Sequence, residues 1–323
     1  MEASMSNADF LHLLGIEQLN AAQIMSILDR AAHYECLLDH DAPRLGKELA
    51  GRTVALLFYE NSTRTRCSFE LAAKYLGAHT TQLTASGSSV QKGESLLDTV
   101  RTLDQMYCDY VVIRHSRSGV PHYLAAQEDL QLSILNAGDG MHEHPTQTLL
   151  DLYTMYRHFG HLEGLKVVIV GDILHSRVAR SHLLALPMLG AQLTFVGPST
   201  LLPRGLKNKH VSFEQDLTRA CQDAHVIMTL RLQAERQRHA YIPSLGEYAR
   251  FYGLKEELLE KAAPNAIFMH PGPTNHEVEM PGALLMHPQS RVHPQVKKGL
   301  LVRMAVLSLI EEARRNRAAE MAR

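Results

Sequence analysis

The sequence lacks several features that would point to a particular class of protein. Its four cysteines stand far apart without a CxxC pair, so it carries neither a zinc knuckle nor a dithiol redox motif, and reduced thiols are expected. No apolar run approaches the ~20 residues of a membrane span. The first residues, MEASMSNADFLHLLG, lack the basic and apolar regions of a signal peptide. We therefore predict a cytoplasmic protein with no membrane partner.

The chain also lacks an excess of charge of either sign. Lys and Arg total 33 against 34 Asp and Glu, and the basic residues are scattered. Binding to a phosphate backbone requires a basic stripe, so no nucleic-acid partner is expected and any anion site must be local. Hydrophobic residues make up 45% of the 323 residues, which is typical of a globular protein. This length allows two domains of about 150 residues each.

Apolar β-branched runs alternate with helical stretches along most of the chain. This alternation predicts parallel sheets wound with helices, in two α/β sets that follow each other. An amphipathic helix over 18–38 precedes them, with an apolar face formed by Ile24, Ile27, Leu28 and Ala31. The expected strands are 53–58, 110–115, 132–138, 166–172, 192–198, 225–231 and 266–270, and the other expected helices are 64–76, 94–107, 145–159, 176–189 and one from about 299.

The two sets indicate an α/β protein with two domains, each a parallel sheet flanked by helices. We place the first domain at 1–144 and the second at 145–298. The last helix, 299–323, has an apolar stripe and no strand after it, so it must pack on an existing unit. We expect this helix to complete the first domain.

Anion-binding groups follow the first expected strand, in the segment FYENSTRTRCSFELAAKYLGA. Ser62 is the natural N-cap of the helix that begins there. The first helical turn offers unpaired N–H groups and a partial positive charge, and here it also carries the side chains of Thr63, Arg64, Thr65 and Arg66. Arginine is unfavourable at a helix N-terminus unless an anion binds. The pattern predicts a phosphate cradle, and the plainer interpretation is a capped helix with solvated arginines.

The segment ENSTRTRxSFE resembles the carbamoyl phosphate signature of the aspartate and ornithine carbamoyltransferases. The resemblance covers almost the whole chain and implies an enzyme that transfers carbamoyl groups; no cofactor is expected. Further segments follow in the family's order, namely Lys92 in SSVQKGESLLDT, Arg114 in VIRH, HPTQTLLDL at 144–152, Arg177 in GDILHSRVARS, LRLQAER at 230–236 and MHPGP at 269–273.

Three segments favour the aspartate branch of this family. KGES follows a loop rich in Ser and Gly, 85–95, which is similar to the mobile loop of the aspartate enzymes. Arg231 and Gln233 offer a planar cation and an amide, which suit a carboxylate and not the ammonium group of ornithine. HPGP stands where the ornithine enzymes have HCLP.

The implied reaction converts carbamoyl phosphate and L-aspartate to N-carbamoyl-L-aspartate and phosphate, the committed step of de novo pyrimidine (UMP) biosynthesis. Transfer to a different amine is an alternative. A non-catalytic homologue that scaffolds a partner chain is another, and it would be expected to show damage in STRTR, KGES or HPTQ, where the sequence shows none.

The chemistry requires a bound phosphate, a polarised carbonyl oxygen and a neutral amine brought to the carbon. Backbone N–H groups from Ser62 to Thr65, with Arg64, would hold the phosphate. Thr65, Arg114 and His144 would donate hydrogen bonds to the carbonyl oxygen as it gains charge. His144 also has a plainer interpretation as a capping or buried histidine.

The resemblance implies the remaining contacts with the substrates. Gln147 and the backbone carbonyls of Pro271 and Gly272 would bind the carbamoyl amino group. Side chains that would bind the two carboxylates of aspartate are Arg177, Arg231 and Gln233.

The resemblance also implies an assembly. In the family, the residues matching Ser88 and Lys92 reach into the site of a neighbouring subunit, which implies a homotrimer with shared sites. A solvated lysine loop is the plainer interpretation of Lys92. Association with a regulatory chain or a dihydroorotase, and control by nucleotides, are left open by the sequence.

Two motifs suggest other ligands but lack essential parts. KVVIVGD precedes a helix, yet GDILHSR has no GxGxxG, which argues against a dinucleotide. His142, Glu143 and His144 form a cluster, but HExxH is absent and no Cys or further carboxylate is spaced to complete a tetrahedron. We therefore predict no metal.

The turn after the last expected strand departs from the family pattern. The family commonly has PGPxNRG, whereas this chain has PGPTNHE, so His276 replaces an arginine and Glu277 replaces a glycine. A group that titrates near pH 6.5 cannot substitute for a permanent charge. We expect this change to weaken domain closure or to make it dependent on pH.

Overall fold

The computed structural model of the protein describes residues 10–40, 46–84, 94–206, 208–232 and 241–323. Contacts divide the chain into two compact units, Met1–Leu150 with Lys298–Arg323, and Asp151–Lys297. Helices α5 (Pro145–Phe159) and α10 (Val292–Met321) each contribute residues to both units.

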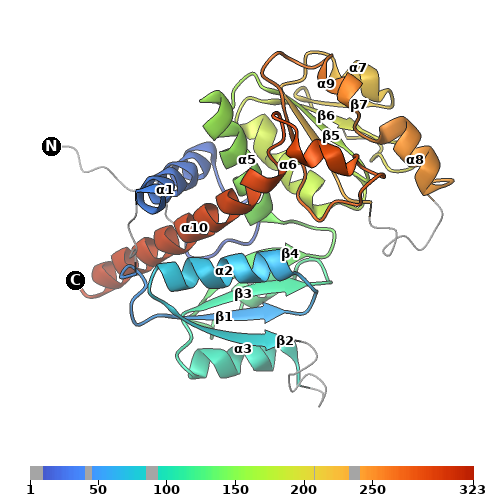
Figure 1. Ribbon diagram of the computed structural model, residues 1–323. Coiled ribbons are helices and arrows are strands. Elements are labelled where there is room, and N and C mark those ends of the chain that lie inside the picture. Colours follow the sequence, from blue (N-terminus) through green and yellow to red (C-terminus); the bar gives the residue numbers. More distant parts are fainter. Residues whose placement is uncertain (1–9, 41–45, 85–93, 207, 233–240) are drawn as a thin grey trace. The chain divides into compact units, whose positions relative to one another are not determined.

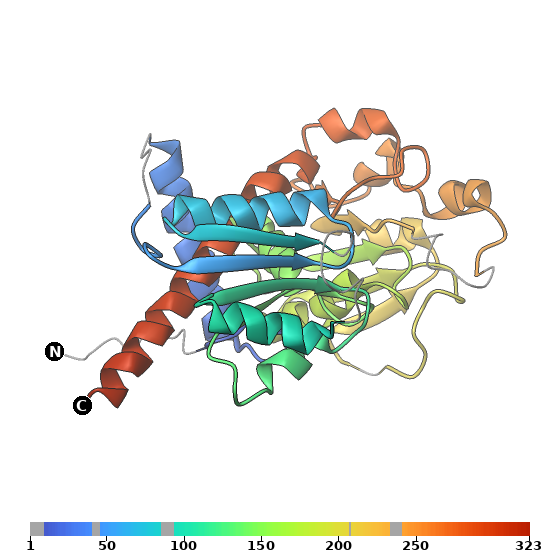
Figure 2. The same ribbon diagram turned by 90° about the horizontal axis from the view of Figure 1, so that it is seen from below.

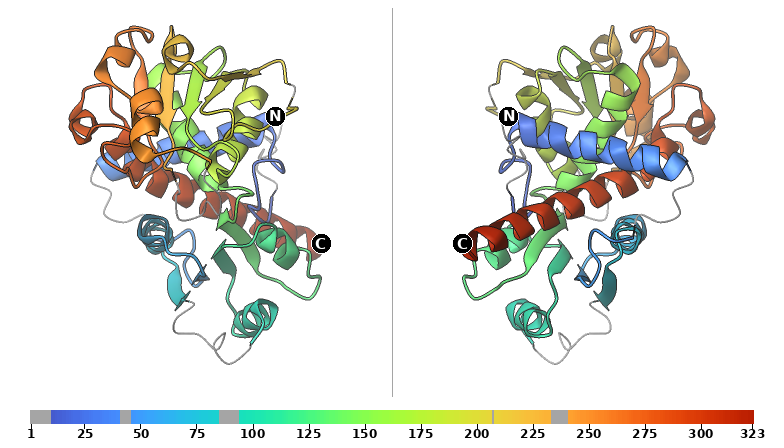
Figure 3. Two further views of the ribbon diagram at one scale, coloured as in Figure 1. Left: turned by 90° about the vertical axis from the view of Figure 1, so that its right-hand side faces the viewer. Right: turned by 90° about the vertical axis from the view of Figure 1, so that its left-hand side faces the viewer.

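The first unit is built on a parallel sheet of four strands in the order β2-β1-β3-β4. All of its strands are parallel, so their carboxyl ends share one edge (Figure 2). Helix α2 covers one face, and α3 and α4 cover the other (Figure 3). The elements are β1 (Thr53–Phe58), α2 (Thr63–Tyr75), β2 (His79–Thr84), α3 (Leu96–Gln105), β3 (Tyr110–His115), α4 (Val120–Ala125) and β4 (Ser133–Asp139).

Helix α2 has a buried apolar face and ends at a glycine. Phe69, Ala72 and Ala73 are fully buried. The N–H of Ala78 bonds to the carbonyl of Ala73, and Gly77 has a φ of +85°. This is a Schellman ending, and Gly77 is needed there both for its φ and because a Cβ would meet the backbone of the preceding loop at 2.3 Å.

Helices α1 (Ala21–Asp39) and α10 lie side by side (Figures 1 and 3). Helix α1 begins with a capping box between Asn20 and Gln23, and it buries all four residues of its expected apolar face. Arg30 of α1 binds Ser308 and Glu312 of α10 at 2.6 and 2.8 Å. The C-terminal helix therefore packs on helices of the first unit, as predicted.

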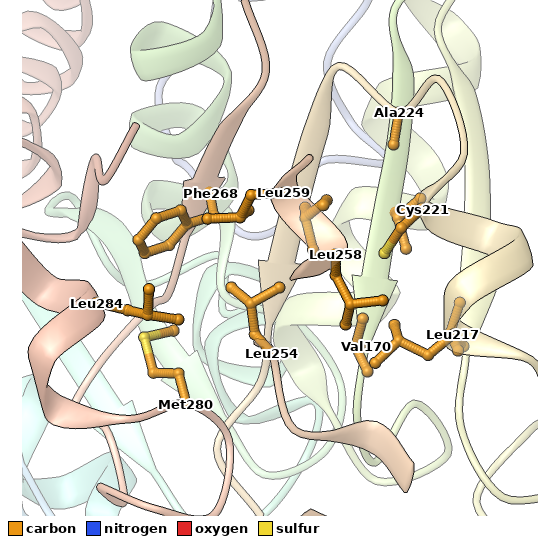
Figure 4. Packing of buried hydrophobic residues seen from close by; sticks show 13 residues of the cluster. Val170, Leu217, Cys221, Ala224, Leu254, Leu258, Leu259, Phe268, Met280 and Leu284 are labelled. Atoms are coloured by element: carbon orange, nitrogen blue, oxygen red, sulfur yellow. The ribbon is translucent and has the colours of Figure 1, made fainter. Parts of the chain in front are cut away.

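The second unit is built on a parallel sheet of five strands in the order β7-β6-β5-β8-β9. Strand residues pack with α7, α9 and the 3-10 helix η3 in the cluster of Figure 4, where Leu254 lies between Met280 and Val170. The elements are β5 (Lys166–Val170), α6 (Arg177–Met188), β6 (Gln192–Val196), β7 (Val211–Glu214), α7 (Leu217–Cys221), β8 (Val226–Thr229), α8 (Leu245–Tyr252), α9 (Glu256–Leu259), β9 (Ile267–Met269) and η3 (Gly282–Met286).

The predicted fold class is confirmed, since both sheets are parallel and flanked by helices. Strands β2 and β7 were not predicted, and both are polar edge strands that lack an apolar run. Helix α10 begins at Val292 and not near residue 299, because Pro294 lies in its first turn, where proline is tolerated. Among the described residues no helix combines the length and the apolar character needed to cross a membrane.

Candidate active site

The first sheet has a topological switch point, where the connections that follow two neighbouring strands run to opposite sides of the sheet. It lies between β1 and β3, because β1 connects to β2 on one side and β3 to β4 on the other. The loops after such strands diverge, and α/β sheets bind ligands at the carboxyl ends of the strands there. Segment 62–65 follows β1, and Arg114 lies near the end of β3, paired with Phe58. Both predicted groups therefore lie at this point.

Segment 62–65 has the backbone of a helix start. Ser62 is the N-cap of α2, as predicted, but its side chain, although described, makes no capping hydrogen bond. The first backbone bond of the helix joins the N–H of Arg66 to the carbonyl of Ser62 at 3.2 Å. Thr65 is buried, whereas Thr63 and Arg64 are exposed. Since the Ser62 hydroxyl does not cap the first N–H groups of α2, these groups can donate hydrogen bonds to a bound anion.

Arg114 is held by a carboxylate from the loop that precedes the cradle. Its Nη2 lies 2.9 Å from Oε1 of Glu60, and its Nη1 donates to the carbonyl of Ala137 at 3.3 Å. Burial and the charge of Arg117 lower the pKa of the adjacent His115, so this ring adds no positive charge near neutral pH. No feature of the sequence singled out Glu60, although it is part of the ENSTRTR segment.

His144 and Gln147 lie at the start of α5, which follows the neighbouring strand β4. The carbonyl of His144 accepts the N–H groups of Gln147 and Thr148 at 3.0 and 3.2 Å, so the main chain of His144 begins the helix. Both predicted side chains are buried. The plainer interpretation of His144, as a residue that caps the helix, therefore holds for its backbone. This interpretation does not conflict with the hydrogen bond that its ring is predicted to donate to the substrate.

Arg303 of α10 is a buried cation that was not predicted from the sequence. Its guanidinium lies 5.0 Å from the centroid of the Phe69 ring in α2, and its Nη2 lies 3.4 Å from Oγ1 of Thr146 in α5. One residue thus contacts the two helices that carry the cradle and His144. Its charge lies within a long helix of apolar pattern, and the sequence offered no local signal that could single it out.

The second sheet has its corresponding point between β5 and β8. Arg177 is the first residue of α6, which follows β5, and Arg231 comes two residues after β8. Arg177 is buried, and Arg231 is half-buried. The two arginines predicted to bind carboxylates therefore follow the two strands that flank this point.

Gly171 lets the ends of β5 and β8 approach each other. Its φ is +147°, and a Cβ there would lie 2.8 Å from the Cβ of Leu230. Leu230 directly precedes Arg231, and its N–H bonds to Val170 of β5 at 2.8 Å. The glycine of the GDILHSR segment thus has a packing role and does not need a dinucleotide to explain it.

The turn after β9 is shaped by its own histidine. The N–H of Gly272 donates to Nδ1 of His270 at 2.7 Å, and Gly272 has a φ of +65°. Glu277, which replaces the usual glycine, also has a φ of +65°, and its Oε1 accepts the N–H of Gly282 at 3.2 Å. His276 is exposed. The expected effect of His276 on closure stays a prediction.

Comparisons with known proteins agree with this arrangement. Residues 11–157 match the family model "Aspartate/ornithine carbamoyltransferase, carbamoyl-P binding domain". Residues 163–310 match "Aspartate/ornithine carbamoyltransferase, Asp/Orn binding domain". The chain belongs to the aspartate/ornithine carbamoyltransferase family. The predicted family is therefore confirmed.

A curated relative from Granulibacter bethesdensis is named as an aspartate carbamoyltransferase catalytic subunit. It is 49% identical over 304 residues, which cover 94% of this chain and 95% of the relative. Among solved structures, aspartate transcarbamoylase from Trypanosoma cruzi in complex with carbamoyl phosphate and aspartate has a TM-score of 0.84 at 29% identity, covering 95% of this chain and 98% of that chain.

The fold is common to both branches of the carbamoyltransferase family. Ornithine carbamoyltransferase from Pyrococcus furiosus has a TM-score of 0.82 at 28% identity, and covers 95% of this chain and 98% of its own. The backbone thus does not separate aspartate from ornithine enzymes. The side chains that face the second substrate must do so.

Three predicted site residues lie outside the described residues. They are Ser88 and Lys92, in the segment before α3, and Gln233, which follows the last described residue after β8. Their assignments rest on the resemblance to carbamoyltransferases and stay predictions.

A histidine and carboxylate cluster lies at the end of β4. Ligand atoms of His122, Asp139 and His142 come within 4.8 Å of one another. The Asp139 carboxylate already accepts the N–H of Gly119 at 2.7 Å and that of Glu143 at 3.1 Å, and it lies 3.1 Å from Nδ1 of His142. These bonds explain its burial as part of the turn into α5. The prediction that the chain holds no metal is untested by this cluster.

Proposed function

We propose that the chain is an aspartate carbamoyltransferase, which transfers the carbamoyl group of carbamoyl phosphate to the amino group of L-aspartate. The products are N-carbamoyl-L-aspartate and phosphate, and the reaction is the committed step of pyrimidine biosynthesis. The observation that carries the choice of aspartate is the pair Arg177 and Arg231, which follow the strands flanking the switch point of the second sheet. Two arginines there match a substrate with two carboxylates and oppose the ammonium group of ornithine.

The first unit would bind carbamoyl phosphate. Backbone N–H groups of 62–65 and the side chain of Arg64 would hold the phosphate at the α2 N-terminus, where the helix dipole favours an anion. Arg114, His144 and Thr65 would donate to the carbonyl oxygen as attack converts it to an oxyanion. Arg114 would exchange its contact with Glu60 for this oxygen or the phosphate.

The second unit would bring the amine to the carbonyl carbon. Arg177 and Arg231, with Gln233, would bind the carboxylates of aspartate, and the carbonyls of Pro271 and Gly272, with Gln147, would orient the carbamoyl NH2 group. The neutral amine attacks, a C–N bond forms, and the tetrahedral intermediate expels phosphate. The phosphate accepts the proton that the amine loses, so no side chain needs to act as a covalent nucleophile.

The proposed assembly is a homotrimer, in the cytoplasm, with Ser88 and Lys92 of each subunit reaching a neighbouring site. A hybrid experiment tests this sharing. Lys92→Ala and Arg114→Ala variants, each inactive alone, should regain part of the wild-type activity when trimers are dissociated and reassembled as mixtures. Mixtures that remain inactive would show that every site is built within one subunit.

The function is tested by assaying the purified chain for transfer to aspartate, with ornithine in a parallel reaction. Turnover with aspartate alone is the expected result. Turnover with ornithine would overturn the choice of substrate. A folded chain that uses neither would favour a scaffolding homologue.

A matched pair of variants on α6 tests the carboxylate site. Arg177→Ala should raise the KM for aspartate by about 10- to 150-fold, because a charge-assisted contact of about 1.5–3 kcal/mol is lost. Arg180→Ala, one turn further along α6 and exposed, should leave the KM unchanged. Equal effects of both variants would mean that Arg177 acts only through the helix.

A further inference from the structure

The second unit contains a buried carboxylate that the proposed reaction does not use directly. Glu279 is 1% exposed and lies beyond the turn that follows β9. The next residue, Met280, is part of the core cluster beside Leu284 (Figure 4). The N–H of Leu254 also bonds to the carbonyl of Glu279 at 2.8 Å. The backbone of Glu279 is therefore anchored in the core of the unit.

Four donors surround the Glu279 carboxylate. Oε1 accepts the N–H of Leu232 at 3.0 Å and Nδ2 of Asn275 at 2.9 Å. Oε2 accepts the N–H of Asn275, and it lies 3.7 Å from Nε2 of His270. Leu232 directly follows Arg231, and Asn275 belongs to the turn that begins at Pro271. One carboxylate thus binds two of the three segments that carry the predicted contacts of the second unit, the third being the start of α6 with Arg177.

His270 extends this arrangement to the turn itself. Because its Nδ1 accepts the N–H of Gly272, the ring proton must be on Nε2, which is the nitrogen that faces Glu279. The N–H of His270 donates to Oε1 of Gln295 at 3.0 Å, and Nε2 of Gln295 donates to Asp151 at 2.6 Å. Buried polar groups therefore fix the histidine from two sides.

We propose that Glu279 is a positioning residue, which holds the Arg231 segment and the Pro271–Gly272 turn in register through its bonds to Leu232 and Asn275 and through the Nε2–H tautomer of His270. This inference rests on the proposed function, since the register matters only if both segments bind substrate. It differs from a purely structural role because it predicts a selective loss of function in the second unit.

Glu279→Gln is the decisive variant. An amide keeps the shape but replaces one acceptor oxygen with an NH2 group, which must face at least one of the four donors. One of the two segments must therefore move. We expect kcat/KM for aspartate to fall at least about 30-fold, a loss of about 2 kcal/mol at RT of about 0.59 kcal/mol. Glu257→Gln, the same change at an exposed site of the same unit, should leave it unchanged.

Inhibition by inorganic phosphate supplies the readout for the first unit. The cradle lies in the other unit, so the inhibition constant for phosphate should stay within twofold of the wild-type value in Glu279→Gln. Parallel loss of phosphate binding would indicate general damage and overturn the proposal. An active wild-type enzyme with unchanged aspartate kinetics in Glu279→Gln would also overturn it, whereas an inactive wild type would instead refute the proposed function.

Two substitutions of His270 test the bond from Gly272 to its ring, independently of whether Glu279→Gln folds. An asparagine places its oxygen near the position of Nδ1 and can still accept the N–H of Gly272, whereas a glutamine reaches the position of Nε2. His270→Asn should retain at least tenfold more activity than His270→Gln at equal thermal stability. Equal activities would show that the bond from Gly272 does not set the turn.

Discussion

The two sheets place arginines at equivalent points but support them in opposite ways. In the first unit, Arg114 is held by the nearby carboxylate of Glu60, and the predicted phosphate cradle is a helix start. In the second unit, the carboxylate of Glu279 accepts hydrogen bonds from backbone N–H groups of the loops that carry predicted substrate contacts. A helix N-terminus brings its own donors and positive potential, whereas loops need an external group to define their shape.

The largest expected effect on activity comes from removing the guanidinium of Arg114 in the first unit. Arg114→Ala should lower kcat by about 10³-fold, because a charged donor to the developing oxyanion is lost. Steady-state assays at saturating aspartate measure the effect. Arg101→Ala removes an exposed arginine of α3 in the same unit and should be neutral. If both variants keep full activity, the first sheet does not bind the reacting group.

The next effect concerns the attachment of α10 to the first unit. Burial disfavours the charge of Glu311, but hydrogen bonds from Tyr110, Arg52 and Arg315 outweigh it, so the pKa of Glu311 is lowered. Glu311→Gln should reduce the free energy of unfolding by about 3 kcal/mol, because charge-assisted hydrogen bonds are weakened, while Arg52 and Arg315 stay partly exposed to water. Glu312→Gln, at a half-exposed position of α10 that contacts Arg30 of α1, should cost less than about 1 kcal/mol.

The cost of Glu311→Gln should depend on pH. Because the pKa of Glu311 is lower in the folded state, its stabilisation is complete above the unfolded value of about 4.3 and is lost as the pH falls through the folded value. Urea unfolding of the wild-type protein and of Glu311→Gln should show a constant difference in the free energy of unfolding from pH 7 to about 5. This difference should narrow below about pH 4. A gap that widens on acidification would contradict the assignment.

A moderate effect is expected where β5 meets β8. Gly171→Ala should cost about 3 kcal/mol, because it combines an unfavourable φ with a contact against Leu230. It should also raise the KM for aspartate, since Arg231 follows Leu230. Gly164 has a φ of +75°, but a Cβ added there would meet open space. Thermal unfolding of Gly164→Ala should therefore show a loss of only about 1 kcal/mol in the free energy of unfolding.

The smallest effects belong to the turn that departs from the family pattern. Glu277→Gly should stabilise the chain by about 1 kcal/mol, because glycine adopts the left-handed backbone conformation of this position without strain. The gain is larger than the loss of the exposed hydrogen bond that the Glu277 carboxylate accepts from Gly282. His276→Arg should lower the aspartate concentration needed for half-maximal rate. An unchanged aspartate dependence would show that position 276 does not affect closure.

The sequence predicted elements best where burial or strong punctuation left a local signal. The limits of β1, β3 and α5 agree with the structure residue by residue, because each strand is an apolar run and α5 begins at Pro145. Edge strands β2 and β7 were missed because HTTQLT and VSFE carry no apolar run, and their pairing is fixed by backbone bonds to the neighbouring strand. Short helices such as α4 lack enough turns to show a period.

By itself, the sequence determined the fold class, the family and the residues predicted to contact substrates. The apolar runs of the strands and the motifs shared with the family are local properties of the sequence. The tertiary structure alone revealed the supporting residues, among them Glu60, Glu279 and Arg303. Their side chains act on groups that are distant in the chain, as when Glu279 binds Leu232, 47 residues away. No local pattern distinguishes such a carboxylate from a solvated one, since only folding removes it from water and surrounds it with donors.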